Sequence, residues 1–212
     1  MGIKEKNIEQ VKAGIERLPE DSIQRINTIV KNNNLSPLEY TVKDNLLFIG
    51  NNVNPLFYLI GSNDDFNPEV LVIPEGTIMI ADYAFKDKKS IKEVKFPDSL
   101  EFLGWYTFDG TSIKDVYISE GKLAYDETLI AFDGNPGPPL DTVSLPYSMY
   151  QIYKEGKDVG LVEAWNRTCK IIYRNSDDSI AEILEPHPLD IYDSSSGKEE
   201  ISHDNDSDEL PF

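Results

Sequence analysis

The chain has 212 residues and a formal net charge of −18, from 38 acidic and 20 basic side chains. That length allows one domain with a hydrophobic core plus terminal extensions, and no apolar run approaches membrane-spanning length. Residues 186–212 carry eight carboxylates and one lysine, a balance of −7, which leaves −11 (−18 minus −7) on the body. An acidic body repels phosphate on average, which argues against non-specific nucleic-acid binding unless the basic residues cluster.

The N-terminal segment, residues 1–36, is expected to form a cap of two short helices. Two stripes of apolar residues at helical spacing are separated by Pro19, and the second is preceded by acidic residues suited to a helix N-terminus. The stripes consist of Ile8, Val11, Ile15 and Leu18, then Ile23, Ile26, Ile29 and Val30. The charged first residues contain no apolar segment of the kind a secretion signal needs, so we expect a cytoplasmic protein.

The middle of the chain repeats itself. Ile73-Pro74 aligns with Phe96-Pro97, Ile80 with Leu103, and Phe85 with Phe108, each at an offset of 23. At offset 22, residues 91–94 match 113–116, and at offset 72, residues 70–74 match 142–146. A period near 23 lies within the range of leucine-rich repeats, in which each repeat supplies one short strand and a return segment. We expect strands over 91–96 and 113–118, and stacking of Phe85 on Phe108.

The phrase from Ile73 to Phe85, followed by Ile91 and Val94, resembles the unit of the BspA-like leucine-rich repeat family. The resemblance covers about residues 47–174, with departures at Ala81 and Thr107 that do not threaten the fold. It implies a mainly β, right-handed solenoid over residues 37–185 with the N-terminal helices as its cap. It also implies an alternative function, as a protein–protein interaction or surface adhesion module.

Few residues could carry catalysis. Cys169 is the single cysteine, so no internal disulfide is possible, and we expect it to be a small buried apolar residue. Both histidines, His187 and His203, lie in the acidic C-terminal segment, which leaves the body without an imidazole for a nucleophilic or zinc site. No glycine-rich phosphate loop is present. We expect a non-enzymatic protein with no cofactor and no metal.

A lysine-rich segment is the candidate nucleic-acid site. Five lysines fall within ten residues, Lys114 is expected beside Lys92 one repeat later, and aromatic residues interleave with them. Ammonium groups that meet phosphate, with rings that stack on bases, are typical of single-stranded-DNA platforms. The candidate residues are Lys86, Lys88, Lys89, Lys92, Lys95, Lys114, Trp105, Tyr106 and Tyr117. A solvated face with buried repeat aromatics is the alternative, and the cluster could also hold the protein's own tail.

Residues 186–212 are expected to be a disordered acidic tail. The sequence given ends in carboxylates, one apolar residue and Pro-Phe, in the order Asp204, Asp206, Asp208, Glu209, Leu210, Pro211 and Phe212. This ending resembles the acidic tip of bacterial single-stranded-DNA-binding proteins. The resemblance implies docking to genome-maintenance proteins, with Phe212 in an apolar pocket, its α-carboxylate on a basic rim and the acidic run as a steering element. A merely solvating tail is the alternative.

The leading hypothesis is therefore a DNA replication or repair protein. Its tip would recruit genome-maintenance proteins, and its repeat body would bind either single-stranded DNA or a protein. The sequence leaves open the tip receptor, the oligomeric state and a host or phage origin.

Overall fold

The computed structural model describes residues 3–36, 39–121, 123, 131–132, 140–155 and 169–186. Two helices come first, α1 (Ile3–Glu16) and α2 (Glu20–Asn32). They fall where the two apolar stripes predict them, and Pro19 separates them because a proline disfavours helical geometry in the residue before it. Val11 of α1 and Ile26 of α2 are buried in the common core.

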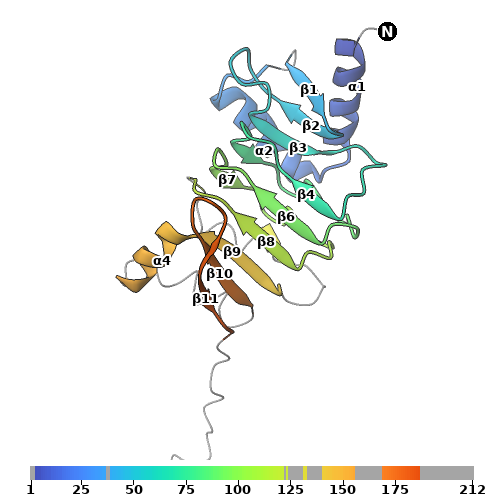
Figure 1. The fold of residues 1–212 in the computed structure, drawn as a ribbon. Coiled ribbons are helices and arrows are strands. Elements are labelled where there is room, and N and C mark those ends of the chain that lie inside the picture. Colours follow the sequence, from blue (N-terminus) through green and yellow to red (C-terminus); the bar gives the residue numbers. More distant parts are fainter. Residues whose placement is uncertain are drawn as a thin grey trace, which may run out of the picture.

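The first sheet has five strands in the order β1-β2-β3-β5-β7. Its first three strands pair antiparallel, whereas β5 and β7 add in parallel. Helix α1 contacts β1, β2 and β3, as Figure 1 shows at the N-terminal end of the molecule. The strands are β1 (Tyr40–Lys43), β2 (Leu46–Ile49), β3 (Tyr58–Ser62), β5 (Met79–Ile80) and β7 (Phe102–Leu103).

The second sheet has six strands in the order β11-β10-β9-β8-β6-β4. All pairs of adjacent strands in this sheet are parallel except β10 and β11, which form an antiparallel hairpin with β11 as the edge strand. Helix α4 (Tyr147–Lys154) follows β9 and contacts β9 and β10. The strands are β4 (Val70–Val72), β6 (Glu93–Phe96), β8 (Asp115–Ile118), β9 (Thr142–Pro146), β10 (Lys170–Arg174) and β11 (Ile180–Leu184).

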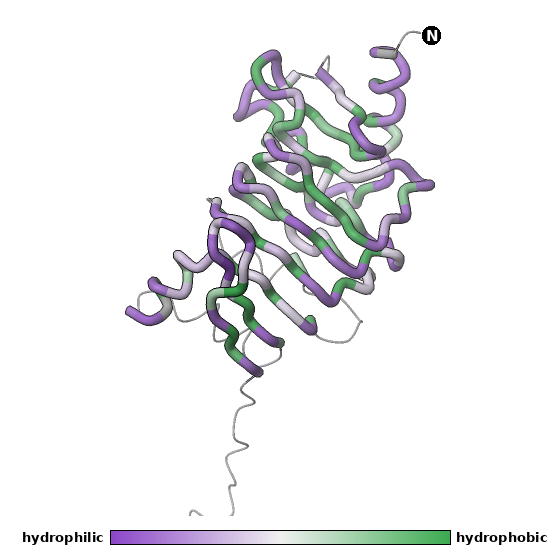
Figure 2. Tube along the Cα trace, in the orientation of Figure 1, coloured by the Kyte–Doolittle hydropathy of each residue, from purple (hydrophilic) through white to green (hydrophobic). Residues whose placement is uncertain are grey.

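The core lies between the two sheets and is built in rows. One inward row of the six-stranded sheet runs through five strands, with every member at most 1% exposed: Leu71, Val94, Val116, Val143 and Ile171. Phe85 stacks on Phe108 with a centroid distance of 5.7 Å and an interplanar angle of 5°, as the repeat spacing predicts. Figure 2 shows the apolar stretches concentrated on the strands, with polar residues on the connecting turns.

The predicted mainly β solenoid with helices at its N-terminus is confirmed in the residues that the structure describes. Ile80 pairs with Leu103, and Val70 shares a row with Thr142, as the offsets of 23 and 72 predict. The sequence did not predict the antiparallel hairpins β1–β2 and β10–β11 at the two ends. In the described parts of the chain, no helix is both long enough and apolar enough to span a bilayer.

Candidate functional site

The surface of the six-stranded sheet that points away from the core, here called the outer face, carries the candidate site. Successive side chains of a strand alternate between the two faces, and strands lie about 4.8 Å apart, so outward residues of neighbouring strands form rows. The first row is Val70, Glu93, Asp115, Thr142 and Lys170, and the second is Val72, Lys95, Tyr117, Ser144 and Ile172.

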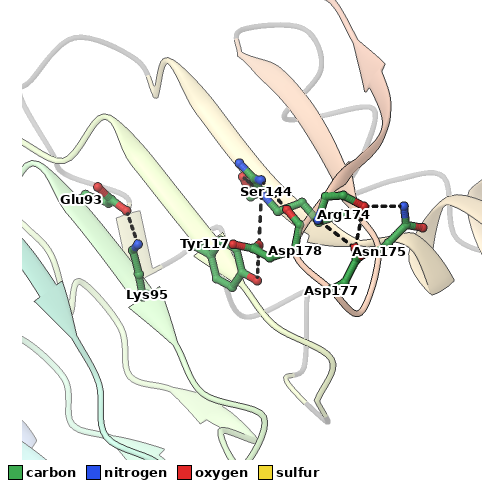
Figure 3. Close-up of polar contacts among 9 residues, drawn as sticks. Glu93, Lys95, Tyr117, Ser144, Arg174, Asn175, Asp177 and Asp178 are labelled. Carbon is green, nitrogen blue, oxygen red and sulfur yellow. Dashed lines mark hydrogen bonds and ion pairs between the residues drawn. The ribbon is translucent and has the colours of Figure 1, made fainter.

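Tyr117 of β8 lies at the centre of the outer face. Its ring is flanked by Lys95 Nζ and the Arg174 guanidinium carbon, 6.0 and 5.9 Å from the ring centroid. Its hydroxyl donates a hydrogen bond to Asp178 Oδ1 at 3.0 Å (Figure 3). Partial burial, the hydrogen bond to Asp178 and that carboxylate's charge together raise the pKa of the Tyr117 hydroxyl. Tyr117 is therefore neutral at physiological pH and presents both an apolar ring and a polar tip.

Asp178 reaches Tyr117 because the turn between β10 and β11 folds over the sheet. The turn closes through the Asn175 amide, which donates to the Ser179 carbonyl at 2.9 Å, and Asp178 has a φ of +67°. Aspartate is among the few non-glycine residues that tolerate this left-handed conformation. Asp177 accepts hydrogen bonds from the Ser179 amide and hydroxyl, which lower the pKa of Asp177.

Arg174 fastens the same turn to the sheet. Its Nη1 donates to the Asp178 carbonyl oxygen at 3.0 Å, and its Nε donates to the Ser144 hydroxyl at 3.4 Å. Figure 3 shows Tyr117 between Lys95 on one side and the Arg174–Asp178 pair on the other. Three strands and one turn thus contribute to a fixed group of side chains around a single aromatic ring.

Three shallow hollows share Tyr117 as a lining residue, with volumes of about 240, 240 and 330 Å³. Together they are lined by six carboxylates and two basic groups, which gives a formal balance of −4. The basic groups are those of Lys95 and Arg174. The carboxylates are those of Glu75, Glu93, Asp98, Asp115, Glu120 and Asp178. The outer face therefore combines an accessible aromatic ring with a negative electrostatic surface.

Three lysines of the predicted nucleic-acid site border this face, and each is engaged by a carboxylate. The Lys114 amide donates to the Lys92 carbonyl oxygen, which confirms that these residues are neighbours on adjacent coils. Lys95 pairs with Glu93 of its own strand at 3.1 Å. The other two pair between coils: Lys92 with Glu69 at 2.8 Å, and Lys114 with Asp141 at 3.0 Å. Each of these three ammonium groups therefore has a carboxylate partner at the surface of the sheet.

The remaining lysines of the predicted site lie on the turns. Lys86 pairs with Asp109 at 3.4 Å. The ammonium group of Lys88 donates to three backbone carbonyls within residues 63–66, and burial together with the nearby Arg17 charge lowers the pKa of Lys88. Lys89 is exposed. Among the six lysines, Lys89 alone has no acidic or carbonyl partner within the part of the chain that the structure describes.

The predicted aromatics divide between the two sheets. Trp105 and Tyr106 follow β7 of the five-stranded sheet, where the Arg25 guanidinium lies 4.1 Å from the Trp105 ring and Tyr106 stacks on Tyr83 at 5.4 Å. Tyr117 belongs to the six-stranded sheet and contacts Lys95. The structure therefore brings Tyr117 together with Lys95 alone of the predicted lysines. Lys92 and Lys114 directly precede β6 and β8, and Trp105 and Tyr106 lie beside the five-stranded sheet.

Two residues of this site were not predicted from the sequence, Arg174 and Asp178. Repeat spacing could have placed Arg174, because β10 continues the parallel rows beside β9. No pattern in the sequence indicates that Asp178 meets Tyr117, since a hairpin turn outside the repeats creates that contact. The predicted tip, residues 204–212, lies outside the described residues, as do His187 and His203.

Comparison with known proteins supports the repeat architecture. Residues 63–155 match the family model described as BspA type leucine rich repeat region, in six copies. This is the family that the motif from Ile73 to Phe85 resembles, and the matched segment contains the strands β4 to β9. No curated protein and no solved structure gives a significant match to the chain.

Proposed function

We propose that this protein is a non-enzymatic protein-binding module that presents the outer face of its six-stranded sheet to a protein partner. The observation that carries the proposal is the position of Tyr117, at the meeting point of three hollows on a hydrogen-bonded sheet. Tyrosine is enriched at binding hot spots because its rigid ring gives contact area and its hydroxyl gives a directed hydrogen bond. The match to BspA type repeats supports the same class of function.

A protein partner suits the electrostatics of the outer face better than single-stranded DNA does. The lysines that border the face are paired with Glu69, Glu93 and Asp141. Non-specific nucleic-acid binding depends on cations that are free to replace the counterions of phosphate. A partner protein can instead match a mixed surface of carboxylates, paired cations and one aromatic ring.

The acidic segment supports a second, separate element of recognition. Residues 204–212 keep the order of carboxylates, Leu210, Pro211 and Phe212 that resembles the tip of single-stranded-DNA-binding proteins. On that resemblance we propose that the segment docks to genome-maintenance proteins, so that the repeat body and the segment would join two partners. Deleting Phe212 tests this: binding to a tip receptor should disappear while the thermal unfolding midpoint stays the same. An unchanged affinity of the deletion variant for the receptor would contradict the proposed role of residues 204–212.

The outer face is tested by selecting a phage-displayed random peptide library against the full chain. Selected peptides are then measured by isothermal titration calorimetry against the wild type and against Tyr117→Ala. We expect that substitution to weaken binding at least about tenfold, or about 1.4 kcal/mol. The matched control is Phe102→Ala, which truncates another exposed aromatic on the other sheet and should leave the affinity unchanged.

Two results would contradict the proposal. Peptides that bind Tyr117→Ala as tightly as the wild type would show that recognition lies elsewhere. Salt-sensitive binding of a labelled oligothymidine that is lost when Lys92, Lys95 and Lys114 are changed to Glu would favour the single-stranded-DNA function instead.

A further inference from the structure

We infer that the hollow at the hydroxyl end of Tyr117 receives a lysine or arginine side chain of the partner protein; this inference rests on the proposed function of the outer face. The hollow, here called the Asp98 hollow, has a volume of about 240 Å³. It lies where β8 and β9 end and the β10–β11 turn folds over them. Its rim carries Asp98, Glu120 and Asp178.

The charge of the Asp98 hollow is unbalanced. Three carboxylates line it against one base, Arg174. Arg174 is already committed to Ser144 and to the main chain of Asp178. Asp98 and Glu120 are exposed, and neither forms an ion pair with a basic side chain in the described part of the chain. Two negative charges are therefore left for a cation to complement.

The walls of the hollow favour an organic cation over a hydrated metal ion. The ring of Tyr117 and the buried Pro146 both line the hollow beside the carboxylates. Lysine and arginine place an aliphatic stem along apolar surface while the charged head stays near water and acidic groups.

The position of Asp98 relative to Tyr117 supports this geometry. Asp98, Tyr117 and Asp178 line the same hollow. A cation that enters it beside Asp98 would therefore share the hollow with Tyr117. Because Tyr117 lines all three hollows, a partner segment that inserts its cation here would cross the central ring of the outer face.

The test uses fluorescein-labelled peptides with a repeated Gly-Ser-Arg unit, together with versions in which each Arg is Gln or Glu. Anisotropy is measured against the full chain, against Asp98→Asn with Glu120→Gln, and against Glu9→Gln with Glu16→Gln. The last pair removes the same charge from exposed positions on α1. All proteins keep the acidic segment 186–212, so its attraction for a cationic peptide is common to them.

We expect the arginine peptide to bind the double variant of the hollow at least about tenfold more weakly than the wild type. The α1 variant should change the affinity by no more than about twofold, since distant surface charges are screened by salt. Equal weakening by both variants would show general electrostatic attraction and overturn the inference. Circular dichroism and the unfolding midpoint verify that each variant is folded.

A charge reversal gives an independent test. The variant Asp98→Lys with Glu120→Lys should bind the glutamate peptide more tightly than the arginine peptide, the reverse of the wild type. An unchanged order of affinities would overturn the inference. The library peptides separate this inference from the proposed function. Suppose that the selected peptides carry no Lys or Arg, lose affinity for Tyr117→Ala, and bind Asp98→Asn with Glu120→Gln as tightly as the wild type. That result would support the binding face and contradict the inference about the cation. Peptides whose affinity is unchanged by Tyr117→Ala would contradict both the proposed function and this inference.

Discussion

Tyr117 donates its hydroxyl to Oδ1 of Asp178 at 3.0 Å, although the two residues are 61 positions apart in the sequence. The contact joins the middle of the six-stranded sheet to the turn that closes its last hairpin. Arg174 binds the same turn from the strand beside it. The outer face is consequently assembled partly by repeats and partly by a terminal element that is not a repeat.

The first prediction concerns this contact and is measured by a double-mutant cycle. Tyr117→Phe and Asp178→Gly should each destabilise the fold slightly, and their coupling energy should be favourable but below about 1 kcal/mol, because the pair is exposed to solvent. Glycine removes the acceptor and tolerates the left-handed backbone of this position. Urea unfolding of the wild type, both single variants and the double variant gives the coupling. Strict additivity would mean that the hydrogen bond contributes nothing to stability.

The second prediction concerns the aromatic stack inside the coils. Phe108 is fully buried and stacks on Phe85 and Phe132, with centroid distances of 5.7 and 5.0 Å. Phe108→Ala should lower the free energy of unfolding by about 3–5 kcal/mol, because it removes buried area and leaves a cavity in a layered core. The control is Phe102→Ala, at a side chain that is 41% exposed, where chemical denaturation should show a much smaller loss.

The third prediction concerns the junction of α2 with the solenoid. Asp82 is buried and accepts from Arg25 Nη1 at 3.2 Å and from the Trp105 amide at 2.8 Å. Arg25→Gln should destabilise the protein by about 1–3 kcal/mol, since a mostly buried carboxylate loses its cation while Arg25 itself is partly exposed. Thermal unfolding of Arg25→Gln, of Asp82→Asn and of the double variant measures this. If the double variant is no better than the sum of the two single changes, the pair is not coupled.

The fourth prediction concerns alkaline pH. Burial raises the pKa of Tyr58 well above its usual 10.0, with a smaller contribution from the Asp82 charge. As pH rises, the unfolded chain releases this proton first, so the stability is fully present below about pH 10 and falls above it. Each such tyrosine contributes a decline of about 1.4 kcal/mol per pH unit in that range.

Tyr58→Phe should make the alkaline decline less steep. Urea unfolding of the wild type and the variant, at neutral pH and above the usual tyrosine pKa of 10.0, measures the difference. The same slope in both proteins would show that Tyr58 does not link folding to pH.

The repeats made much of the fold predictable from the sequence. Where a contact links the same position of successive coils, the spacing identifies both partners, as it does for Phe85 with Phe108 and Ile80 with Leu103. The same spacing could have revealed the Glu69–Lys92 ion pair, which joins residues 23 positions apart. Proximity along the chain groups the lysines with one another, whereas proximity between coils places Glu69 beside Lys92.

The rest of the site depends on geometry that no repeat encodes. The β10–β11 turn places Asp178 over the sheet through a left-handed backbone and its own hydrogen bonds. Neither the residue type nor its spacing points to Tyr117. Asp178 and Tyr117 come into contact only when the turn and the distant strand β8 are both folded.

The aligned rows of the sheet also bear on how this surface can change over generations. From Val70 to Lys170 the successive row members are 23, 22, 27 and 28 residues apart, yet the strands remain in register. Insertions are therefore absorbed between strands, and the aliphatic row inside stays intact. Point mutations can replace one outward residue at a time. Duplication of a whole coil would add one more strand to the sheet, and so one more residue to each outward row. New binding preferences can thus arise by small steps without a new fold.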